Sequence, residues 1–189
     1  MKGLLLNAGQ LDFMRKMYFG KYFGGIKMYK SFQDLTLGNL FDTQLKRSPN
    51  HVVQIFEDGK RQTYAQLNDR ANRLANGLLR LGIKKGNFVA IYAMNCLEYM
   101  EFHLATTRVG IVAVMLNCFM PKERILYMLE MSASKAVIFE DQYQKIVKYC
   151  RENISTLEHC MMINRGEGEP EEKTIDYEQL IEALSLIHI

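Results

Sequence analysis

The side chains best suited to chemistry in this chain lie between positions 96 and 108. They are the thiol of Cys96, the carboxylates of Glu98 and Glu101, the imidazole of His103 and the guanidinium of Arg108. A thiol just before a helix can have a lowered pKa. The two carboxylates are three residues apart on one helix face, and an arginine can bind a phosphate group.

Each of these residues also has a structural explanation, which we favour. Cys96 fits a buried, inert thiol, and the two glutamates fit a solvated helix face or a helix cap. His103 lies between two apolar residues, as a packed histidine does. Arg108 either faces solvent or reaches a phosphate held by polypeptide outside this chain. We therefore predict no catalytic, cofactor-binding or metal-binding residue in these 189 positions.

Glycine-rich phosphate loops are absent from the sequence. Gly20 and Gly25 have the spacing of a Walker loop, but Ile26 stands where the lysine should follow. No G-x-G-x-x-G follows a predicted strand, and Gly166 and Gly168 lie among glutamates that would repel a phosphate. There is no G-x-S-x-G nucleophile elbow either. An unrelated Rossmann-like nucleotide binder is therefore the least favoured alternative.

The cysteines and histidines do not have the spacing of metal ligands. The four cysteines, at positions 96, 118, 150 and 160, show no C-x-x-C pair, which is typical of reduced core residues in a cytosolic protein. The four histidines, at positions 51, 103, 159 and 188, are scattered singly. We expect all eight side chains to be structural.

The overall composition is that of a globular protein, with 48% apolar and 24% charged residues. The net charge of +3 is too small to indicate nucleic-acid binding. No segment reaches the ~18 apolar residues of a membrane span, and the apolar stretch at 4–6 is too short for a signal peptide.

Residues 1–35 form a basic, amphipathic segment in which aromatic residues alternate with lysine and arginine. Such a segment can lie on an anionic membrane surface. The interpretation that we favour is a helix packed on its own domain with lysines extended into solvent.

Hydrophobic periodicity defines the elements that would position these side chains. We predict a helix at 36–47, then a hairpin at 52–63 turning at Asp58-Gly59. A long helix follows, capped by Thr63 with Gln66 and ended by Gly82 in a left-handed conformation. Its polar residues, Asp69, Arg70, Asn72, Arg73 and Arg80, are assigned to the solvent face.

From residue 88 onward, strands and helices alternate. Apolar runs at 88–93, 111–116, 135–139 and 159–163 predict strands buried on both faces. The intervening helices begin near Asn95, which forms a capping box with Glu98, near Pro121 and after Asp141; Asp176 with Gln179 caps the last. Residues 164–173 form an exposed loop. The pattern predicts an α/β fold, a parallel sheet flanked by helices and preceded by a short hairpin.

The order of these motifs resembles the adenylate-forming ligases, the superfamily of acyl-CoA synthetases, adenylation domains and luciferases. The resemblance covers residues 36–163 and includes the segment SASKAVI at 132–138. Asn87 replaces the usual Asp, and Ala93-Met94 replaces a frequent Leu-Pro. The other matching residues, in chain order, are Thr63-Tyr64, Leu67, Ala71-Asn72, Leu74-Ala75, Leu81-Gly82, Gly86, Val89-Ala90, Asn95, Glu98-Tyr99, Leu104-Ala105, Gly110 and Leu116-Asn117.

The resemblance implies that residues 36–184 are part of an AMP-binding N-terminal domain, namely its first lobe, and that 185–189 are a tail that need not be native. Within the superfamily, the sequence is most similar to acyl-CoA synthetases of the long-chain and fatty-acid-transport type, followed by carnitine- or crotonobetaine-type CoA ligases. The complete enzyme would use ATP, Mg²⁺ and coenzyme A to convert a fatty acid through acyl-AMP to a thioester.

The family's phosphate-binding loop, later acidic motifs and catalytic lysine have no counterpart here, so the resemblance implies a fragment that is inactive alone and binds none of these cofactors tightly. We expect a cytoplasmic location, with peripheral membrane contact through residues 1–30 as an option and no nucleic-acid partner. A non-catalytic module that binds a membrane or a partner is the alternative function.

Overall fold

The computed structural model describes residues 36–166 and 168–183, so the predictions for residues 1–35 and 185–189 lie outside the described residues. A five-stranded sheet forms its centre, with the strand order β4-β3-β5-β6-β7. All four strand pairs in this sheet are parallel, as predicted. The strands are β3 (Phe88–Tyr92), β4 (Val112–Met115), β5 (Ala136–Glu140), β6 (His159–Ile163) and β7 (Thr174–Asp176).

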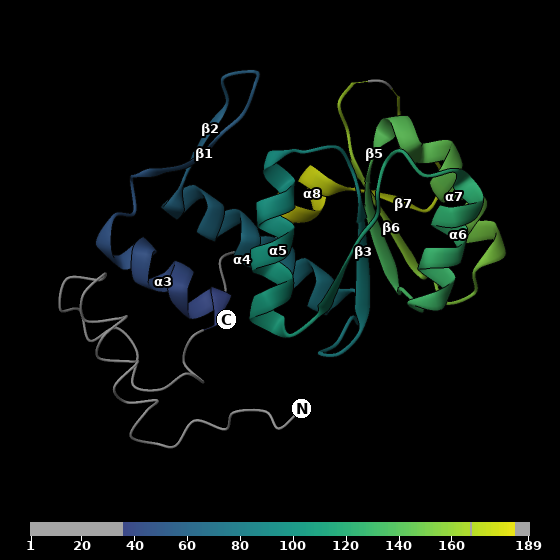
Figure 1. Cartoon of the computed structure of the whole chain (residues 1–189), viewed down its shortest axis with the longest axis horizontal. Coiled ribbons are helices and arrows are strands. Elements are labelled where there is room, and N and C mark those ends of the chain that lie inside the picture. The colour runs from purple at the N-terminus through teal and green to yellow at the C-terminus, as the bar shows by residue number, and fades with distance from the viewer. Residues whose placement is uncertain (1–35, 167, 184–189) are drawn as a thin grey trace, which may run out of the picture.

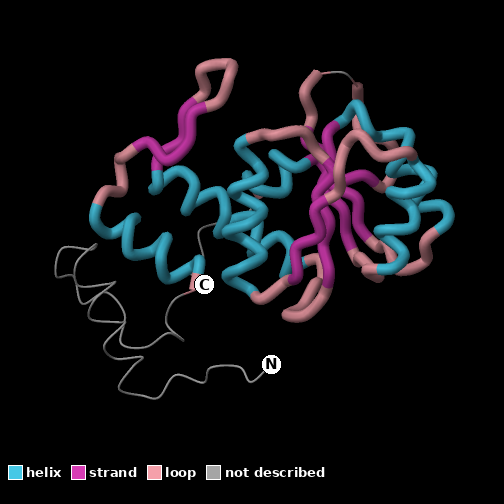
Figure 2. Tube along the Cα trace, viewed as in Figure 1, coloured by secondary structure: helices cyan, strands magenta, loops and turns pink. Residues whose placement is uncertain are grey.

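Helices cover both faces of the sheet (Figure 1). On one face lie α4 (Tyr64–Arg80), α5 (Leu97–Val109) and α8 (Tyr177–Glu182), with α3 (Leu37–Arg47) outside them. On the other lie α6 (Lys122–Met131) and α7 (Gln144–Asn153), which follows the short 3₁₀ helix η3 (Asp141–Tyr143). Figure 2 shows the same three layers, with the magenta strands between two groups of cyan helices.

Two apolar cores, one on each side of the sheet, hold these layers together. The first joins α4, α5 and α8 to the sheet through buried residues such as Leu74, Phe102 and Ile138. The second packs α6 and α7 against the opposite face, around Ile125 and Phe139. Because side chains alternate across a strand, Ile138 and Phe139 point into different cores. A strand with both faces covered is mostly apolar, which explains the apolar run at residues 136–139 of β5.

The hairpin and the first long helix form as the sequence predicts. Strands β1 (Val52–Ile55) and β2 (Arg61–Thr63) pair antiparallel. At the start of α4, the Gln66 N–H donates to the Thr63 hydroxyl while the Gln66 side chain accepts from the Thr63 N–H, which completes the capping box. Gly82 ends the helix with a φ of 81°, and the Ile83 N–H returns to the Leu78 carbonyl, as a Schellman-type end requires.

Several sequence predictions need correction. β4 is not buried on both faces: it is an edge strand whose Val112 and Met115 side chains are exposed. β7, beyond the 164–173 loop, was not predicted, because three residues carry too little periodicity to register. The N-cap of α5 is Cys96 without a side-chain hydrogen bond, so the predicted Asn95–Glu98 capping box does not form.

Gly110 ends α5 and gives a stability prediction. Its φ is 69°, and its N–H donates to the Thr106 carbonyl. An added Cβ would stand 2.8 Å from Cγ of Lys85. Since a left-handed backbone strains an L-residue by about 1–2 kcal/mol, we expect Gly110→Ala to lower the free energy of unfolding by that amount in urea titrations.

The control for this substitution is Gly38→Ala within α3. Gly38 has no positive φ, and its nearest neighbour to an added Cβ is 3.9 Å away. Alanine there should leave the stability unchanged or raise it by up to about 1 kcal/mol. Equal losses in the two variants would contradict the assignment of strain to Gly110.

Candidate functional site

A cluster of charged side chains lies where β3, β5 and β6 end. In open α/β sheets, ligands bind beyond the carboxyl ends of the strands, so this edge is the first place to look for a site. Glu140 closes β5, Arg165 follows β6, and Glu98 comes from the first turn of α5, just beyond β3. The cluster thus draws on three elements that are far apart in sequence.

Arg165 holds the cluster together. Its guanidinium donates to both oxygens of Glu98, at 3.0 and 2.8 Å, and to Oε1 of Glu140 at 3.2 Å. Its backbone N–H donates to Asp141 Oδ2 at 2.7 Å. The second oxygen of Glu140 accepts from the Met94 N–H at 2.9 Å. The three acids are therefore engaged within the protein.

The electrostatics of Glu98 follow from this geometry. Burial disfavours the charged carboxylate, but hydrogen bonds and the positive charge of Arg165 outweigh it, and the pKa of Glu98 is lowered. The two acids in turn raise the pKa of Arg165 against the effect of burial. A carboxylate held ionised in this way is a poor general acid. The contacts of Arg165 with Asp141 and Glu98 instead anchor the 164–173 loop.

Cys96 is an inert thiol, as predicted. It is 7% exposed, and burial together with the neighbouring charge of Glu98 raises its pKa to about 12. The helix N-terminus next to it does not overcome these effects, so almost no thiolate exists at neutral pH. All four cysteines are free; Cys96, Cys150 and Cys160 are buried as predicted, whereas Cys118 is only half-buried.

Glu101 does not lie on a solvated helix face, contrary to the sequence interpretation. It is 1% exposed and accepts hydrogen bonds from three side chains on separate elements. These are Arg70 Nε at 2.6 Å, Gln62 Nε2 at 2.7 Å and the Tyr177 hydroxyl at 2.8 Å. Arg70 also forms a two-fold contact with Glu178, at 2.8 and 2.6 Å. This network fixes α8 against α4 and α5.

Arg108 neither faces solvent nor is available to a phosphate. Its guanidinium donates to Asp42 at 2.7 Å, to Asn68 at 2.8 Å and to Asn72. Asn72 is buried rather than solvated, which corrects its assignment to the wet face of α4, as the network above does for Arg70. Arg108 therefore joins α3, α4 and α5. The predicted packing of His103 agrees with its half-buried position, with the Phe102 ring 6.0 Å away.

A buried hydroxyl near the same sheet edge has no hydrogen-bond partner among the described residues. It belongs to Tyr92, the last residue of β3, whose ring stacks on Tyr143 with 4.2 Å between centroids. Burial raises the pKa of Tyr92. An unsatisfied buried polar group costs about 1–3 kcal/mol.

We expect Tyr92→Phe to raise the free energy of unfolding by about 1 kcal/mol, since it removes the unsatisfied group and keeps the ring. The matched control is Tyr177→Phe, which removes a hydroxyl that is bonded to Glu101. That variant should lose about 1–2 kcal/mol. Thermal and urea unfolding measure both, and the same sign for the two variants would refute this account.

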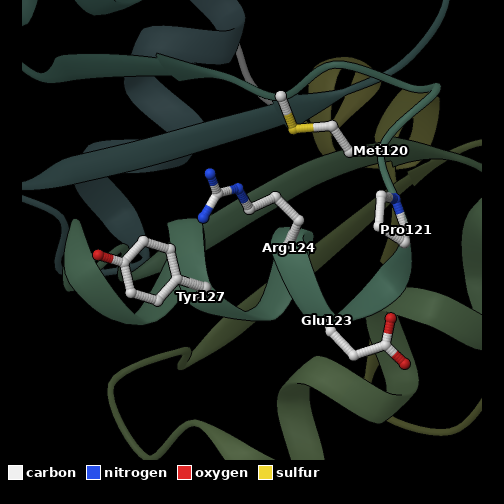
Figure 3. A pocket seen from close by; sticks show the side chains of 5 residues that line it. All are labelled: Met120, Pro121, Glu123, Arg124 and Tyr127. Carbon is white, nitrogen blue, oxygen red and sulfur yellow. The ribbon is translucent and has the colours of Figure 1, made fainter.

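An open depression lies beside the start of α6, lined by Met120, Pro121, Glu123, Arg124 and Tyr127. Figure 3 shows the Arg124 guanidinium between Met120 and Tyr127, with Glu123 pointing away. The guanidinium carbon lies 5.5 Å from the centre of the Tyr127 ring. The lining holds no nucleophile paired with a base.

The described residues hold several of their charged side chains in contact with one another. They contain no group of three or more His, Cys, Asp or Glu that could hold a metal ion. The half-buried Arg70 and Arg108 and the exposed Arg165 are each engaged with acids or amides. None of the described helices is long and apolar enough to cross a membrane.

Comparison with known proteins identifies the family to which this chain belongs. The AMP-binding enzyme family model matches residues 41–184, so the chain belongs to this family of adenylate-forming ligases. This confirms the predicted resemblance to the N-terminal portion of these ligases. The fold class is confirmed as well, since solved ligases share the architecture.

Two relatives and one solved structure illustrate the similarity. YngI of Bacillus subtilis, described as an acyl-CoA synthetase, is 34% identical over 110 residues, covering 58% of this chain and 20% of YngI. The medium-chain acyl-CoA ligase ACSF2 of Rattus norvegicus is 29% identical over 110 residues, covering 58% and 18%. A Rhodopseudomonas palustris protein described as a long-chain-fatty-acid CoA ligase superimposes with a TM-score of 0.70 and 28% identity, covering 79% and 37%.

The coverage of these relatives is low. The chain spans about a fifth of the length of the two curated relatives.

Proposed function

We propose that this chain supplies the N-terminal portion of an AMP-forming acyl-CoA synthetase and does not complete the reaction alone. The family match over residues 41–184 carries the proposal. In the complete enzyme, a carboxylate would attack the α-phosphate of ATP, and the thiol of coenzyme A would then take the acyl group. ATP, Mg²⁺ and coenzyme A are thus the reactants that we assign to the complete protein.

A fatty acid is the carboxylate that we favour. Two of the compared ligases carry medium-chain acyl or long-chain fatty-acid substrates in their descriptions. A carnitine- or crotonobetaine-type acid is the alternative from the sequence.

The role of this chain in such an enzyme is structural support. The clusters around Arg70 and Arg108 fix the helices α3, α4, α5 and α8 to one another, and the cluster around Arg165 fixes the start of the 164–173 loop to α5 and β5. A transition state with charge on the transferring phosphate requires cations and metal ions that face it, and these engaged arginines do not provide them. The proposed inactivity is therefore supported by these contacts, because the arginines that could otherwise stabilise a phosphate already bind acids within the protein.

Pyrophosphate release tests this proposal. The purified chain, given ATP, Mg²⁺, coenzyme A and octanoate or palmitate, should release pyrophosphate at the rate of a protein-free control. Release above that rate, abolished by omitting the fatty acid, would refute the claim of inactivity.

The second arm adds polypeptide from a solved relative that this chain matches over 37% of its length. The chain is co-expressed with the part of the Rhodopseudomonas palustris protein outside the stretch that it matches. The assembled pair should release pyrophosphate faster with octanoate or palmitate than with benzoate. An assembled pair that is no faster than the added polypeptide alone would refute the proposed function.

A further inference from the structure

Helix α3 is the least covered helix of the fold. Among the described α-helices, it alone has no buried residue. Its inner side is held by Phe41, whose ring centre lies 5.3 Å from that of Tyr64, and by Asp42, which pairs with Arg108 at 2.7 Å. These contacts fix the position of α3 outside α4 and α5 but leave part of its apolar surface uncovered (Figure 1).

The uncovered part is formed by Leu37 and Leu40, which we call the α3 flank. Leu37 is 51% exposed and Leu40 is 37% exposed. Side chains three positions apart lie on the same side of a helix, so the two leucines make one apolar strip beside the inner side. A helix of 11 residues is marginal in water unless its apolar side is covered. Leaving this strip in solvent therefore gives up stabilisation that a covering segment would supply.

The polypeptide that precedes α3 has the chemistry to cover this strip. Residues 13–23 contain five aromatic residues, two methionines and three basic residues, but no acid. Residues 24–36 connect them to α3, and a connection of this length can extend over about 40 Å. Since α3 is only about 16 Å long at 1.5 Å per residue, the aromatic residues can reach any point of the α3 flank.

Covalent attachment distinguishes the α3 flank from other exposed apolar side chains, such as Ile55 in β1, which is 63% exposed. The α3 flank begins directly after Thr36. Residues on a short tether meet such a surface at an effective concentration in the millimolar range, whereas a separate partner or a second copy has to be bound from solution. The basic side chains of the segment are long enough to reach solvent past an apolar contact.

We propose that residues 13–23 pack across the α3 flank of their own chain and cover Leu37 and Leu40 with aromatic side chains. This packing withholds the aromatic side chains from a membrane surface. The basic N-terminal segment then stabilises α3 and does not anchor the protein. A membrane and a second copy of the chain are the competing occupants, and the experiment separates them.

Hydrogen exchange of the 189-residue chain tests this packing. Three forms are compared: the unmodified chain, the flank variant Leu37→Lys with Leu40→Lys, and the control variant Tyr127→Lys with Met131→Lys. Tyr127 is 50% exposed and Met131 67% exposed, and both lie on α6 at the opposite face of the sheet. Lysine is a good helix former, and circular dichroism establishes that all three forms are folded.

In the unmodified chain, the amides of residues 13–23 should exchange at least tenfold more slowly than in a free peptide of the same sequence. The flank variant should lose this protection, because a charged group opposes burial, and the control variant should keep it. Photo-cross-linking gives a second readout that leaves the α3 flank apolar. The substitution Leu40→p-benzoyl-phenylalanine should produce cross-links within one chain to residues 13–23.

Four results would overturn the proposal. In the first, residues 13–23 of the unmodified chain exchange as fast as the free peptide. In the second, their protection is the same in the flank variant, or the cross-links from position 40 avoid them. In the third, protection rises with protein concentration, which would assign the α3 flank to a second copy. In the fourth, protection appears only with phosphatidylserine vesicles, which would assign the segment to a membrane.

Discussion

Arg70→Met should lower the free energy of unfolding by about 3–5 kcal/mol, because it leaves the Glu101 carboxylate buried without its cation. Glu101 is 1% exposed, and Arg70 lies 2.6 Å from it. The remaining donors, Gln62 and Tyr177, are neutral. Urea unfolding at neutral pH, followed by circular dichroism, measures the loss.

Two further variants make this prediction specific. Lys135→Met removes an ion pair whose members are 36% and 48% exposed, and it should cost less than about 1 kcal/mol. The double variant Arg70→Met with Glu101→Leu removes both charges and should recover part of the loss, since the unpaired charge causes most of it. A double variant less stable than Arg70→Met would contradict that cause.

Arg165→Met should lower the free energy of unfolding by about 2–3 kcal/mol at pH 7, since it removes the cation of a largely buried ion pair that is partly screened by water. The substitution leaves Glu98 and Glu140 buried next to each other without the guanidinium that contacts both. We expect a smaller loss than for Arg70, since Arg165 is 34% exposed against 28% for Arg70, and its partners Glu98 and Glu140 are 9% and 7% exposed against 1% for Glu101.

The effect of Arg165→Met should also depend on pH. Arg165 lowers the pKa of Glu98 below its ordinary 4.5. A lowered pKa stabilises the fold above the unfolded-state pKa, and this stability is lost as the pH falls through the folded-state value. The difference between the unmodified chain and the variant should therefore shrink as the pH falls below 4.5 and through the lowered pKa of Glu98.

The control for this second prediction is Lys148→Met. Its partner Glu171 is 31% exposed and Lys148 itself 48%, so the loss should stay below about 1 kcal/mol at every pH. A constant loss for Arg165→Met across this pH range would show that the apolar stem of Arg165, rather than its charge, stabilises the fold.

Local signals in the sequence were enough to predict the fold. The capping box at Thr63, the left-handed glycine at 82 and the apolar runs of β3 and β5 each depend on residues within a few positions. Such patterns report directly on backbone conformation and burial. The parallel arrangement followed from the alternation of strand and helix.

The charged clusters could not be predicted in the same way. Glu101 finds its partners at positions 62, 70 and 177, and Glu98 finds its partner at 165. A glutamate on a helix has the same local pattern whether it faces water or a distant arginine. Arg108 was missed for the same reason, since Asp42 and Asn68 approach it only after α3 and α4 have packed. β4 matched a buried strand in composition, and only the strand order shows that it is an edge.

The central position of β3 has a consequence for the order in which the chain folds during synthesis. β3 is the first strand of the five-stranded sheet to leave the ribosome, and β4 and β5 pair with its two sides. Each new strand therefore meets a template that already exists, and the loops to be closed stay short. β6 then pairs with β5, and β7 pairs with β6, in the order in which they are synthesised. The sheet can therefore extend strand by strand during translation.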